Sequence, residues 1–371
     1  MVATLPKLPK ALGTFFAQFQ RKDGESVIGI DVGTSSIKIV QLAEKKGSAV
    51  LETYGEIALG PYAGAEVGQA ANPPNDKVVE ALKDLMQEAN VTSRTGGVSV
   101  PLSASLISLI TLPTRRTSDL ASMIPIEARK YIPVPVSEVT LDWFVIPEEE
   151  AEFLSATGRT KTANATDVLL VAIHNATLSR LNAVTKGAGI TPRFYEIEPF
   201  SMSRSAYEHD TAPTMVIDLG ASGTRVYVIE FGIVDVSHTV NRGGQDITHA
   251  LARAKGLSFA EAESLKRREG VAGAESESGK TSLEYVFSEA RRIFLTYQRK
   301  EGKAISKVVL VGGGAALKGA AELASSHFDV EVTLGTAFDR VAAPAFISDV
   351  LSEAGPSFAN AVGLALRAIK G

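Results

Sequence analysis

Two stretches of the chain share one pattern of hydrophobic and polar positions. Residues 28–40 (IGIDVGTSSIKIV) carry apolar residues up to an aspartate, then a glycine and three hydroxyl residues, then alternating apolar residues. Residues 214–229 (TMVIDLGASGTRVYVI) repeat the order apolar-apolar-Asp-apolar-Gly-small-Ser in the second half of the chain. Apolar runs joined by a short glycine-containing turn predict β-hairpins. The repeat predicts that the chain is built from two related lobes.

The aspartates Asp31 and Asp218 end the first strand of each hairpin, and Lys38 and Arg225 follow them at the same spacing. Turn geometry explains the glycines but gives the aspartates only a capping role. A phosphate bound with a metal ion explains both residue types, because turn glycines let backbone N–H groups approach phosphate oxygens and carboxylates hold Mg²⁺. We expect such a site, with turn capping as the alternative.

The rest of the chain alternates between helical and strand-like patterns. Helices are expected at residues 76–90, 176–187 and 358–369, strands at 96–102, 191–198 and 307–315, and two further helices between residues 246 and 300. Strands at residues 106–113, 140–146 and 167–173 surround a helix at 118–132, which predicts a small α+β insertion. The predicted domains are an arm (1–26), a first lobe (27–209) with an inserted subdomain at about 103–174, and a second lobe (210–371) with a helical subdomain at about 242–303.

The N-terminal arm carries an apolar stripe at helical spacing, flanked by basic residues. The stripe consists of Leu12, Phe15, Phe16 and Phe19. A basic amphipathic helix can dock on a membrane surface. The alternative is a short helix or a frayed arm that lies on the protein's own surface or on a partner, because the stripe is brief and contains Gly13.

Composition excludes several classes of protein. The 371 residues carry a net charge of −4, so there is no basic excess for binding a nucleic-acid backbone. The chain has no cysteine, which excludes disulfides, thiolate metal sites and thiol nucleophiles and suits the reducing cytosol. No run approaches the roughly 20 apolar residues that span a bilayer, and no secretory signal is present. We therefore expect a cytoplasmic protein.

The motifs, taken in order, resemble those of the actin-like ATPase superfamily. They are the first hairpin (DVGTSS), a connecting segment (EIEPFSMSRSAY), the second hairpin (DLGASGT), a helix with a Glu-to-Lys pair (FAEAESLKRREG), a glycine turn (LVGGGAALKG) and a last connecting helix (FANAVGLAL). The resemblance implies an α/β fold: a duplicated actin-like, ribonuclease H-like, two-lobe ATPase with a small α+β insertion in the first lobe. It also implies ATP and Mg²⁺ as cofactors.

Within that superfamily, the run RRTSDLASMIPIEARKYIPVPVSEVTLDW and the insertion resemble the PilM type of type IV pilus assembly protein. That resemblance implies a scaffold at the inner face of the cytoplasmic membrane that binds the N-terminal cytoplasmic peptide of a PilN-type inner-membrane protein and is sensitive to nucleotide. The alternative is a filament-forming cell-division protein of the FtsA type, with self-association. A sugar kinase would need a catalytic aspartate in the first lobe, and the sequence shows no such signature.

The resemblance assigns the phosphates and the metal to the two hairpins. Asp31 and Asp218 are expected to hold Mg²⁺, and Lys38 to bind the β- and γ-phosphates. An outward-facing lysine on an alternating strand is the other interpretation of Lys38. The turn residues expected around the phosphates are Gly33, Thr34, Ser35, Ser36, Gly220, Ser222, Gly223 and Thr224.

Further residues are expected to contact the nucleoside and the attacking water. Glu263 and Lys266 share a helix face and would bind the ribose hydroxyls, or they form an ordinary surface ion pair. The backbone glycines expected near the base are Gly243, Gly244, Gly312, Gly313 and Gly314. Glu198 is the candidate catalytic residue that orients water; helix capping is its alternative role, and Glu196 is the alternative carboxylate. Any ATPase activity is expected to be slow.

The insertion supplies the candidate residues of a peptide groove. They are Leu109, Ile110, Leu112, Met123, Ile124 and Ile126. Ordinary core packing is the alternative interpretation for most of them.

Overall fold

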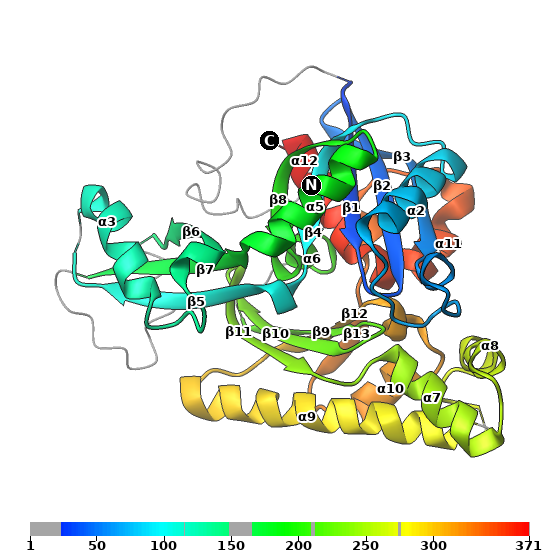
Figure 1. Ribbon diagram of the computed structural model, residues 1–371. Coiled ribbons are helices and arrows are strands. Elements are labelled where there is room, and N and C mark those ends of the chain that lie inside the picture. The colour runs from blue at the N-terminus through cyan, green and yellow to red at the C-terminus, as the bar shows by residue number, and fades with distance from the viewer. Residues whose placement is uncertain (1–23, 115, 148–164, 209–211, 274–275, 371) are drawn as a thin grey trace. The chain divides into compact units, whose positions relative to one another are not determined.

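The computed structural model describes residues 24–114, 116–147, 165–208, 212–273 and 276–370 (Figure 1). Residues 1–23 of the predicted N-terminal arm, which include its apolar stripe, lie outside these residues. The chain divides into two compact units. One consists of residues 101–180, and the other contains the described residues before 101 and after 180. We call the first the insertion unit and the second the two-lobe unit.

The two-lobe unit contains two five-stranded sheets with the same strand order. The first sheet has the order β3-β2-β1-β4-β8. Its strands are β1 (Ser26–Val32), β2 (Ser36–Lys45), β3 (Ser48–Ala58), β4 (Thr95–Val100) and β8 (Thr191–Ile197). β1 pairs with β2 antiparallel and with β4 parallel, and Asp31 lies opposite Lys38 in the ladder.

The second sheet repeats this arrangement in the order β11-β10-β9-β12-β13. Its strands are β9 (Thr214–Leu219), β10 (Thr224–Glu230), β11 (Ile233–Val240), β12 (Lys307–Val311) and β13 (Glu331–Leu334). β9 pairs with β10 antiparallel and with β12 parallel, and Asp218 lies opposite Arg225. The predicted duplication is therefore confirmed at the level of strand order and register.

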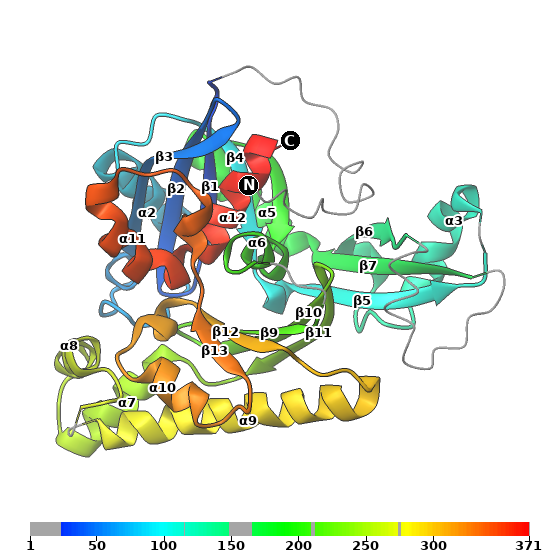
Figure 2. The same ribbon diagram turned by 180° about the vertical axis from the view of Figure 1, so that it is seen from behind.

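Helices cover both sheets. The helices of the two-lobe unit are α2 (Asn75–Glu88), α6 (Glu198–Ser205), α7 (Gly244–Lys255), α8 (Phe259–Glu269), α9 (Glu277–Glu301), α10 (Ala320–Ser325), α11 (Ser348–Ala354) and α12 (Ala359–Lys370). α12 lies against the first sheet (Figure 2), so closely that a Cβ on Gly29 would lie 2.0 Å from Ala361 O. α9 runs along the second sheet, and its Phe287 and Phe294 join the core of that lobe.

The helical part of the second lobe differs from the prediction. It contains the three helices α7, α8 and α9, not two. Ser258 caps α8 through the amide of Glu261, and Gly256 ends α7 in the left-handed conformation. These capping residues divide the segment before α9 into two helices. A search for apolar periodicity alone does not detect such a break.

The insertion unit is a three-stranded antiparallel sheet in the order β5-β7-β6, with one face covered by α3. The elements are β5 (Ser105–Leu112), α3 (Thr117–Ala128), β6 (Val139–Val145) and β7 (Thr166–His174), and α5 (Asn175–Gly187) continues into the two-lobe unit. The expected α+β content of this segment is confirmed. None of the helices described here combines the length and apolar character needed to cross a bilayer.

Candidate functional site

Two hairpin turns of the two-lobe unit carry backbone N–H groups that donate to no acceptor among the described residues. In the first turn the amide of Gly33 donates to Ser36 O at 3.0 Å, whereas those of Thr34 and Ser35 donate to no described residue. In the second turn, the amides of residues 221–223 likewise have no acceptor in the described part of the chain. Successive free amides in a turn form an anion-binding concavity. The two turns can therefore bind negatively charged groups.

The tips of the two turns face each other. Thr34 Oγ1 donates a hydrogen bond to Ser222 Oγ at 3.1 Å. Both hydroxyl residues were predicted to contact one ligand, and the fold brings them together from the two repeats. The backbone carbonyl of Thr34 also accepts a hydrogen bond from the amide of Ala71 at 2.8 Å, and this bond holds the first turn in place.

Asp31 is oriented by the neighbouring strand. Ser99 on β4 is fully buried and donates its hydroxyl to Asp31 Oδ1 at 2.7 Å. The same hydroxyl accepts from the amide of Val32 at 3.2 Å. One carboxylate oxygen of Asp31 is thus held in place, and Oδ2 accepts no hydrogen bond from the described residues. The sequence pattern did not identify Ser99, because a buried serine on a strand carries no local signal.

Asp218 lies deeper, with 6% of its surface exposed. Its Oδ2 accepts from Arg225 Nη1 at 3.3 Å. Burial raises the pKa of Asp218, and the negative charge of Asp31 adds to this effect, although Arg225 opposes it. The two expected metal ligands therefore lie close enough to act on each other, which is how paired carboxylates behave before a cation binds.

The glycine turn after β12 packs directly on Asp218. Gly312 has φ +82° and ψ +168°, and a Cβ there would lie 2.4 Å from Asp218 Oδ1. Only glycine adopts this backbone conformation readily. A Cβ on Gly314 would lie 2.7 Å from the side chain of Leu219, whereas one on Gly313 would meet no described atom within 4 Å. Two of the three predicted glycines are thus required by close packing.

Lys38 does not point away from the protein. Its Nζ donates to Ser36 Oγ at 2.9 Å and pairs with Glu56 on β3 at 3.0 Å. Only 12% of its side chain is exposed. Burial acts to raise the pKa of Glu56, but the charge of Lys38 and the hydrogen bonds from Ser36 and Lys38 together outweigh it, and the pKa is lowered. The interpretation of Lys38 as an outward lysine is therefore wrong.

Glu198 begins α6 and lies close to the second hairpin. Its Oε2 is 3.4 Å from Arg225 Nε, and the residue is 5% exposed. It therefore shares Arg225 with Asp218, which places it beside the predicted phosphate site.

The alternative carboxylate, Glu196, belongs to a separate ion-pair network. Arg204 on α6 contacts both of its oxygens, at 2.8 and 2.9 Å, and Arg367 on α12 pairs with it at 2.5 Å. Burial alone would raise the pKa of Glu196, but the two arginines lower it. Glu196 thus joins β8 to both connecting helices.

Glu263 and Lys266 form a buried ion pair, so their interpretation as a surface pair is wrong. Their charged atoms are 2.6 Å apart and their side chains are each 7% exposed. Thr248 of α7 donates to Glu263 Oε2 at 2.7 Å, and Lys266 donates to Gly244 O at 3.1 Å. The pair is buried because a first-lobe loop covers it: a Cβ on Gly68 would lie 2.5 Å from the Glu263 carboxyl carbon.

The start of α7 packs against the second hairpin. The amide of Gly244 donates to Gly220 O at 2.9 Å, and that of Gln245 to Ala221 O at 3.0 Å. A Cβ on Gly243 would lie 2.5 Å from both Ala221 O and Gly223 N. Asp246 accepts from the amide of Gly243 at 2.9 Å, as a capping residue does.

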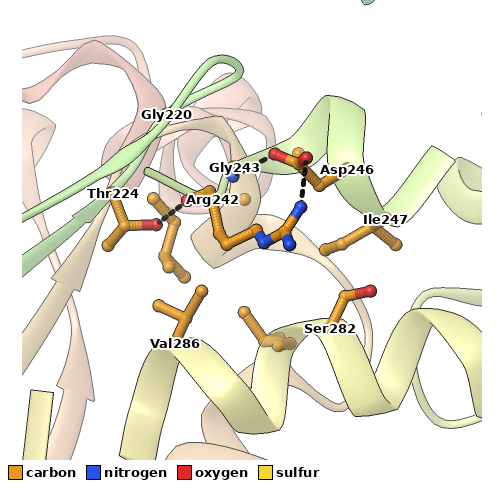
Figure 3. Close-up of a pocket in the computed structure, with 12 residues that line it drawn as sticks. Gly220, Thr224, Arg242, Gly243, Asp246, Ile247, Ser282 and Val286 are labelled. Atoms are coloured by element: carbon orange, nitrogen blue, oxygen red, sulfur yellow. Dashed lines mark hydrogen bonds and ion pairs between the residues drawn. The ribbon is translucent and has the colours of Figure 1, made fainter. Parts of the chain in front are cut away.

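A small cavity lies beside this junction (Figure 3). Thr224 Oγ1 donates to Arg242 O at 2.8 Å, and the Arg242 side chain reaches Asp246 at 3.1 Å. The cavity measures about 10 Å³, roughly the room of one water. Its lining includes the predicted Gly220, Thr224, Gly243, Gly244 and Gly314, together with Leu219, Ile247, Ser282, Leu283 and Val286. An adenine ring would need these elements to separate.

No cluster of three or more His, Cys, Asp or Glu side chains able to hold a metal occurs within the described residues. Asp31 and Asp218 therefore offer two carboxylates without a third acidic, histidine or cysteine ligand from the described residues. This donor set suits Mg²⁺, which keeps several waters and binds through one or two carboxylates and phosphate oxygens.

Known proteins resemble this chain over nearly its full length. Residues 29–369 match the family model for "Type IV pilus assembly protein PilM". A solved structure described as a PilM-PilN type IV pilus biogenesis complex matches with a TM-score of 0.78 and 24% identity, covering 93% of this chain and 99% of that one. The ethanolamine utilization protein EutJ from Carboxydothermus hydrogenoformans matches with a TM-score of 0.55 and 14% identity over 97% of this chain and 98% of that one. A MamK double helical filament matches with a TM-score of 0.52 and 11% identity over 93% and 99%.

Proposed function

The chain belongs to the family of the type IV pilus assembly protein PilM, and from this membership we propose that it is an ATP-binding scaffold of the pilus inner-membrane assembly platform. The scaffold holds the N-terminal cytoplasmic peptide of a PilN-type membrane protein and responds to nucleotide. The observation that carries the nucleotide part is the pair of facing turns with free amides, flanked by Asp31 and Asp218.

The residues present fit a magnesium-bound triphosphate. Asp31 Oδ2 and Asp218 Oδ1 accept no hydrogen bond from the described residues, so one oxygen of each carboxylate remains for a hydrated cation. The free amides of both turns supply donors for phosphate oxygens. When bound, Mg²⁺ would neutralise phosphate charge, while this chain's turns orient the anion and exclude water from it.

Three contacts between the lobes make the site responsive to a ligand. They are the Thr34–Ser222 hydrogen bond, the 3.2 Å bond from the amide of Ala70 to Gln245 Oε1, and the approach of Gly68 to Glu263. All three lie around the space in which the triphosphate and the nucleoside would bind. If a nucleotide binds more tightly to the state with separated lobes, it increases the population of that state. The size of the shift is set by the difference between its affinities for the separated and the closed state.

Slow ATP turnover follows from the state of Glu198. Its side chain is only 6% exposed, and in this structure its carboxylate is paired with Arg225. In-line attack on a γ-phosphate needs a water held by a free acceptor. We therefore infer that nucleotide binding, more than hydrolysis, carries the function.

For the peptide partner, the solved PilM-PilN complex is the relevant likeness. The insertion unit offers a surface of suitable chemistry. On the face of the β5-β7-β6 sheet opposite α3, the apolar side chains Ile107, Leu109, Phe144, Val171 and Ile173 are half-buried. Of the six candidate groove residues, Ile110, Leu112 and Ile124 are not groove residues, because they are fully packed in the core beneath α3, which was their alternative interpretation. Leu109 and Met123 are half-buried, and Ile126 is 65% exposed.

Calorimetric titration of the full-length protein tests the proposal. The titrant is a synthetic peptide of the cytoplasmic N-terminus of the PilN-type protein encoded in the same genome, with and without Mg-ATP. We expect binding in both conditions and an affinity that differs at least about five-fold between them, a coupling near 1 kcal/mol. Absence of peptide binding in either condition contradicts the scaffold, and equal affinities contradict nucleotide sensitivity. Pelleting with Mg-ATP, without peptide binding, would instead favour a filament-forming protein.

A further inference from the structure

A single guanidinium joins two buried carboxylates at the second hairpin. Arg225 lies opposite Asp218 in the β9–β10 ladder, with Nη1 3.3 Å from Asp218 Oδ2. Its Nε is 3.4 Å from Glu198 Oε2, on a different element. The arginine side chain is 15% exposed. Neither the phosphate-binding residues nor the metal ligands assigned above include this cation.

The contacts of Arg225 leave most of its hydrogen-bonding capacity unused. A guanidinium has five N–H donors, yet the only hydrogen bond that Arg225 donates within the described residues goes to Asp218. Charge-assisted N–H···O bonds are usually about 2.7–2.9 Å long, so both carboxylate contacts are long. The guanidinium lies between its two partners without a close bidentate bond to either.

The same guanidinium borders the turn with free amides. A Cβ on Gly220 would lie 3.2 Å from Arg225 Nη1, so the absence of a side chain there leaves room beside the cation. Residues 221–223 follow directly, and their amides donate to no described acceptor. An anion bound in this turn would therefore lie within reach of Arg225, and arginine is well suited to phosphate because its planar fork matches the oxygens.

A second side chain nearby lacks the partner that its burial demands. Tyr227 lies two residues further along β10, on the same face as Arg225, and is fully buried. Its hydroxyl has no hydrogen-bond partner in the described part of the chain. Burial raises the pKa of Tyr227 well above its usual value, and the next largest contribution is the charge of Glu198. A buried hydroxyl without a partner is costly, so an arrangement that gives this hydroxyl an acceptor would be stabilised by it.

We propose that Arg225 is a ligand for the terminal phosphate of a nucleoside triphosphate and that, when it turns to this phosphate, the hydroxyl of Tyr227 donates to Glu198 in its place. The inference rests on the nucleotide site proposed above and adds its specificity: the second hairpin distinguishes triphosphate from diphosphate. Phosphate oxygens replace the long carboxylate contacts of Arg225, and the unpaired hydroxyl of Tyr227 gains an acceptor.

The test compares the affinities of the full-length protein for Mg-ATP and Mg-ADP, measured by calorimetry. We expect R225M to lose at least about ten-fold in affinity for Mg-ATP and less than about three-fold for Mg-ADP, because the charge-assisted contact that it removes is made only to the terminal phosphate. Arg253→Met, at an exposed position on α7, is the matched control and should change neither. Equal losses for both nucleotides, or no loss for Mg-ATP, would overturn the role of Arg225.

Two further variants keep the test decisive. R225M leaves two buried carboxylates without their cation. If R225M fails to fold for this reason, the double variant R225M/E198Q is compared with E198Q, and the quantity compared is again the ratio of the affinities for Mg-ATP and Mg-ADP. Y227F should unfold at the same temperature as the wild type or higher without nucleotide, because it removes an unpaired hydroxyl, and yet lower the preference for Mg-ATP. A fall in unfolding temperature would overturn the role of Tyr227. If the wild type binds neither nucleotide, the proposed nucleotide site itself is wrong. This result is distinct from an R225M variant whose affinity for Mg-ATP is unchanged.

Discussion

The hydroxyl of Thr34 donates to the hydroxyl of Ser222 over 3.1 Å, although the two residues are 188 positions apart in the chain. Each lies at the tip of one copy of the repeated hairpin. The bond therefore closes the space between two turns that both present free amides. A triphosphate that binds both turns must break it, so this contact opposes ligand entry while it stabilises the closed lobes.

Thr34→Ala should therefore speed nucleotide association. An exposed neutral hydrogen bond contributes about 1 kcal/mol or less, so the rate constant should rise by up to about five-fold, with a similarly small loss in the free energy of unfolding. Stopped-flow fluorescence with a labelled ATP analogue measures the rate. Thr296→Ala, an exposed threonine on α9 that bonds only within its helix, is the control. A slower association in Thr34→Ala would show that the hydroxyl aids binding instead of opposing it.

Asp31→Ala should abolish magnesium-dependent ATP binding without unfolding the protein. Asp31 is only half-buried and its one described hydrogen bond comes from Ser99, so its loss costs the fold little. The metal, in contrast, loses one of the two carboxylates that this chain offers. Calorimetry with Mg-ATP measures binding, and circular dichroism with thermal unfolding measures the fold. Asp349→Ala, at an exposed position on α11, should bind normally. Unchanged affinity in Asp31→Ala would contradict the metal site.

Gly312→Ala should destabilise the second lobe through its contact with Asp218. The backbone there has φ +82° and ψ +168°, and the added Cβ would lie 2.4 Å from Oδ1. We expect a loss of about 3 kcal/mol or more in the free energy of unfolding, because strain of about 1–3 kcal/mol adds to the clash. Urea denaturation measures it.

Gly302→Ala is the matched control for that change. Gly302 also has a positive φ, +65°, but a Cβ there would meet no described atom within 4 Å. This variant should lose only the left-handed penalty, about 1–2 kcal/mol. Equal losses in the two variants would mean that the close approach to Asp218 contributes nothing.

The sequence predicted the features that local pattern encodes and missed those that arise from packing between distant segments. Both hairpins, with Asp31 opposite Lys38 and Asp218 opposite Arg225, follow from apolar alternation around a glycine turn. Ser99 could not be found in this way, since its role depends on the parallel pairing of β4 beside β1.

Burial of charge was equally hidden from the sequence. The spacing of Glu263 and Lys266 fits a surface pair, but the start of α7 and the first-lobe loop at Gly68 pack against the pair and bury it. Likewise, Ile110 and Ile124 have the apolar character expected of a groove, but the antiparallel pairing of β5 with β7 turns Ile110 toward α3 and the core. Apolar character alone cannot separate a core position from a binding surface.

Glu196→Gln should destabilise the protein at neutral pH but not in acid. Arg204 and Arg367 lower the folded-state pKa of Glu196 below its ordinary value of 4.5, against the effect of burial. A lowered folded pKa means that the stabilisation is complete above pH 4.5 and disappears as the pH falls through the folded value. At pH 7 we expect a loss of about 3 kcal/mol, as for other buried pairs that lose a partner.

Urea denaturation at pH 7 and at pH 4 and below measures this difference. The gap between Glu196→Gln and wild type should narrow as the pH falls. Glu80→Gln removes one member of an exposed pair with Lys77, and it should match wild type at every pH. A gap for Glu196→Gln that does not depend on pH would show that its charge does not stabilise the fold.

Val171→Ser should weaken binding of the membrane protein's peptide and leave ATP binding unchanged. Val171 lies on the face of the insertion sheet opposite α3, opposite Ile107 on β5. Removing two methyl groups from an apolar contact costs roughly 1–2 kcal/mol, or about ten-fold in peptide affinity, measured by calorimetry. Ile126→Ser makes a similar change on α3, where the side chain is 65% exposed, and should bind like wild type. The opposite result, with Ile126→Ser weakened and Val171→Ser normal, would move the peptide site to α3.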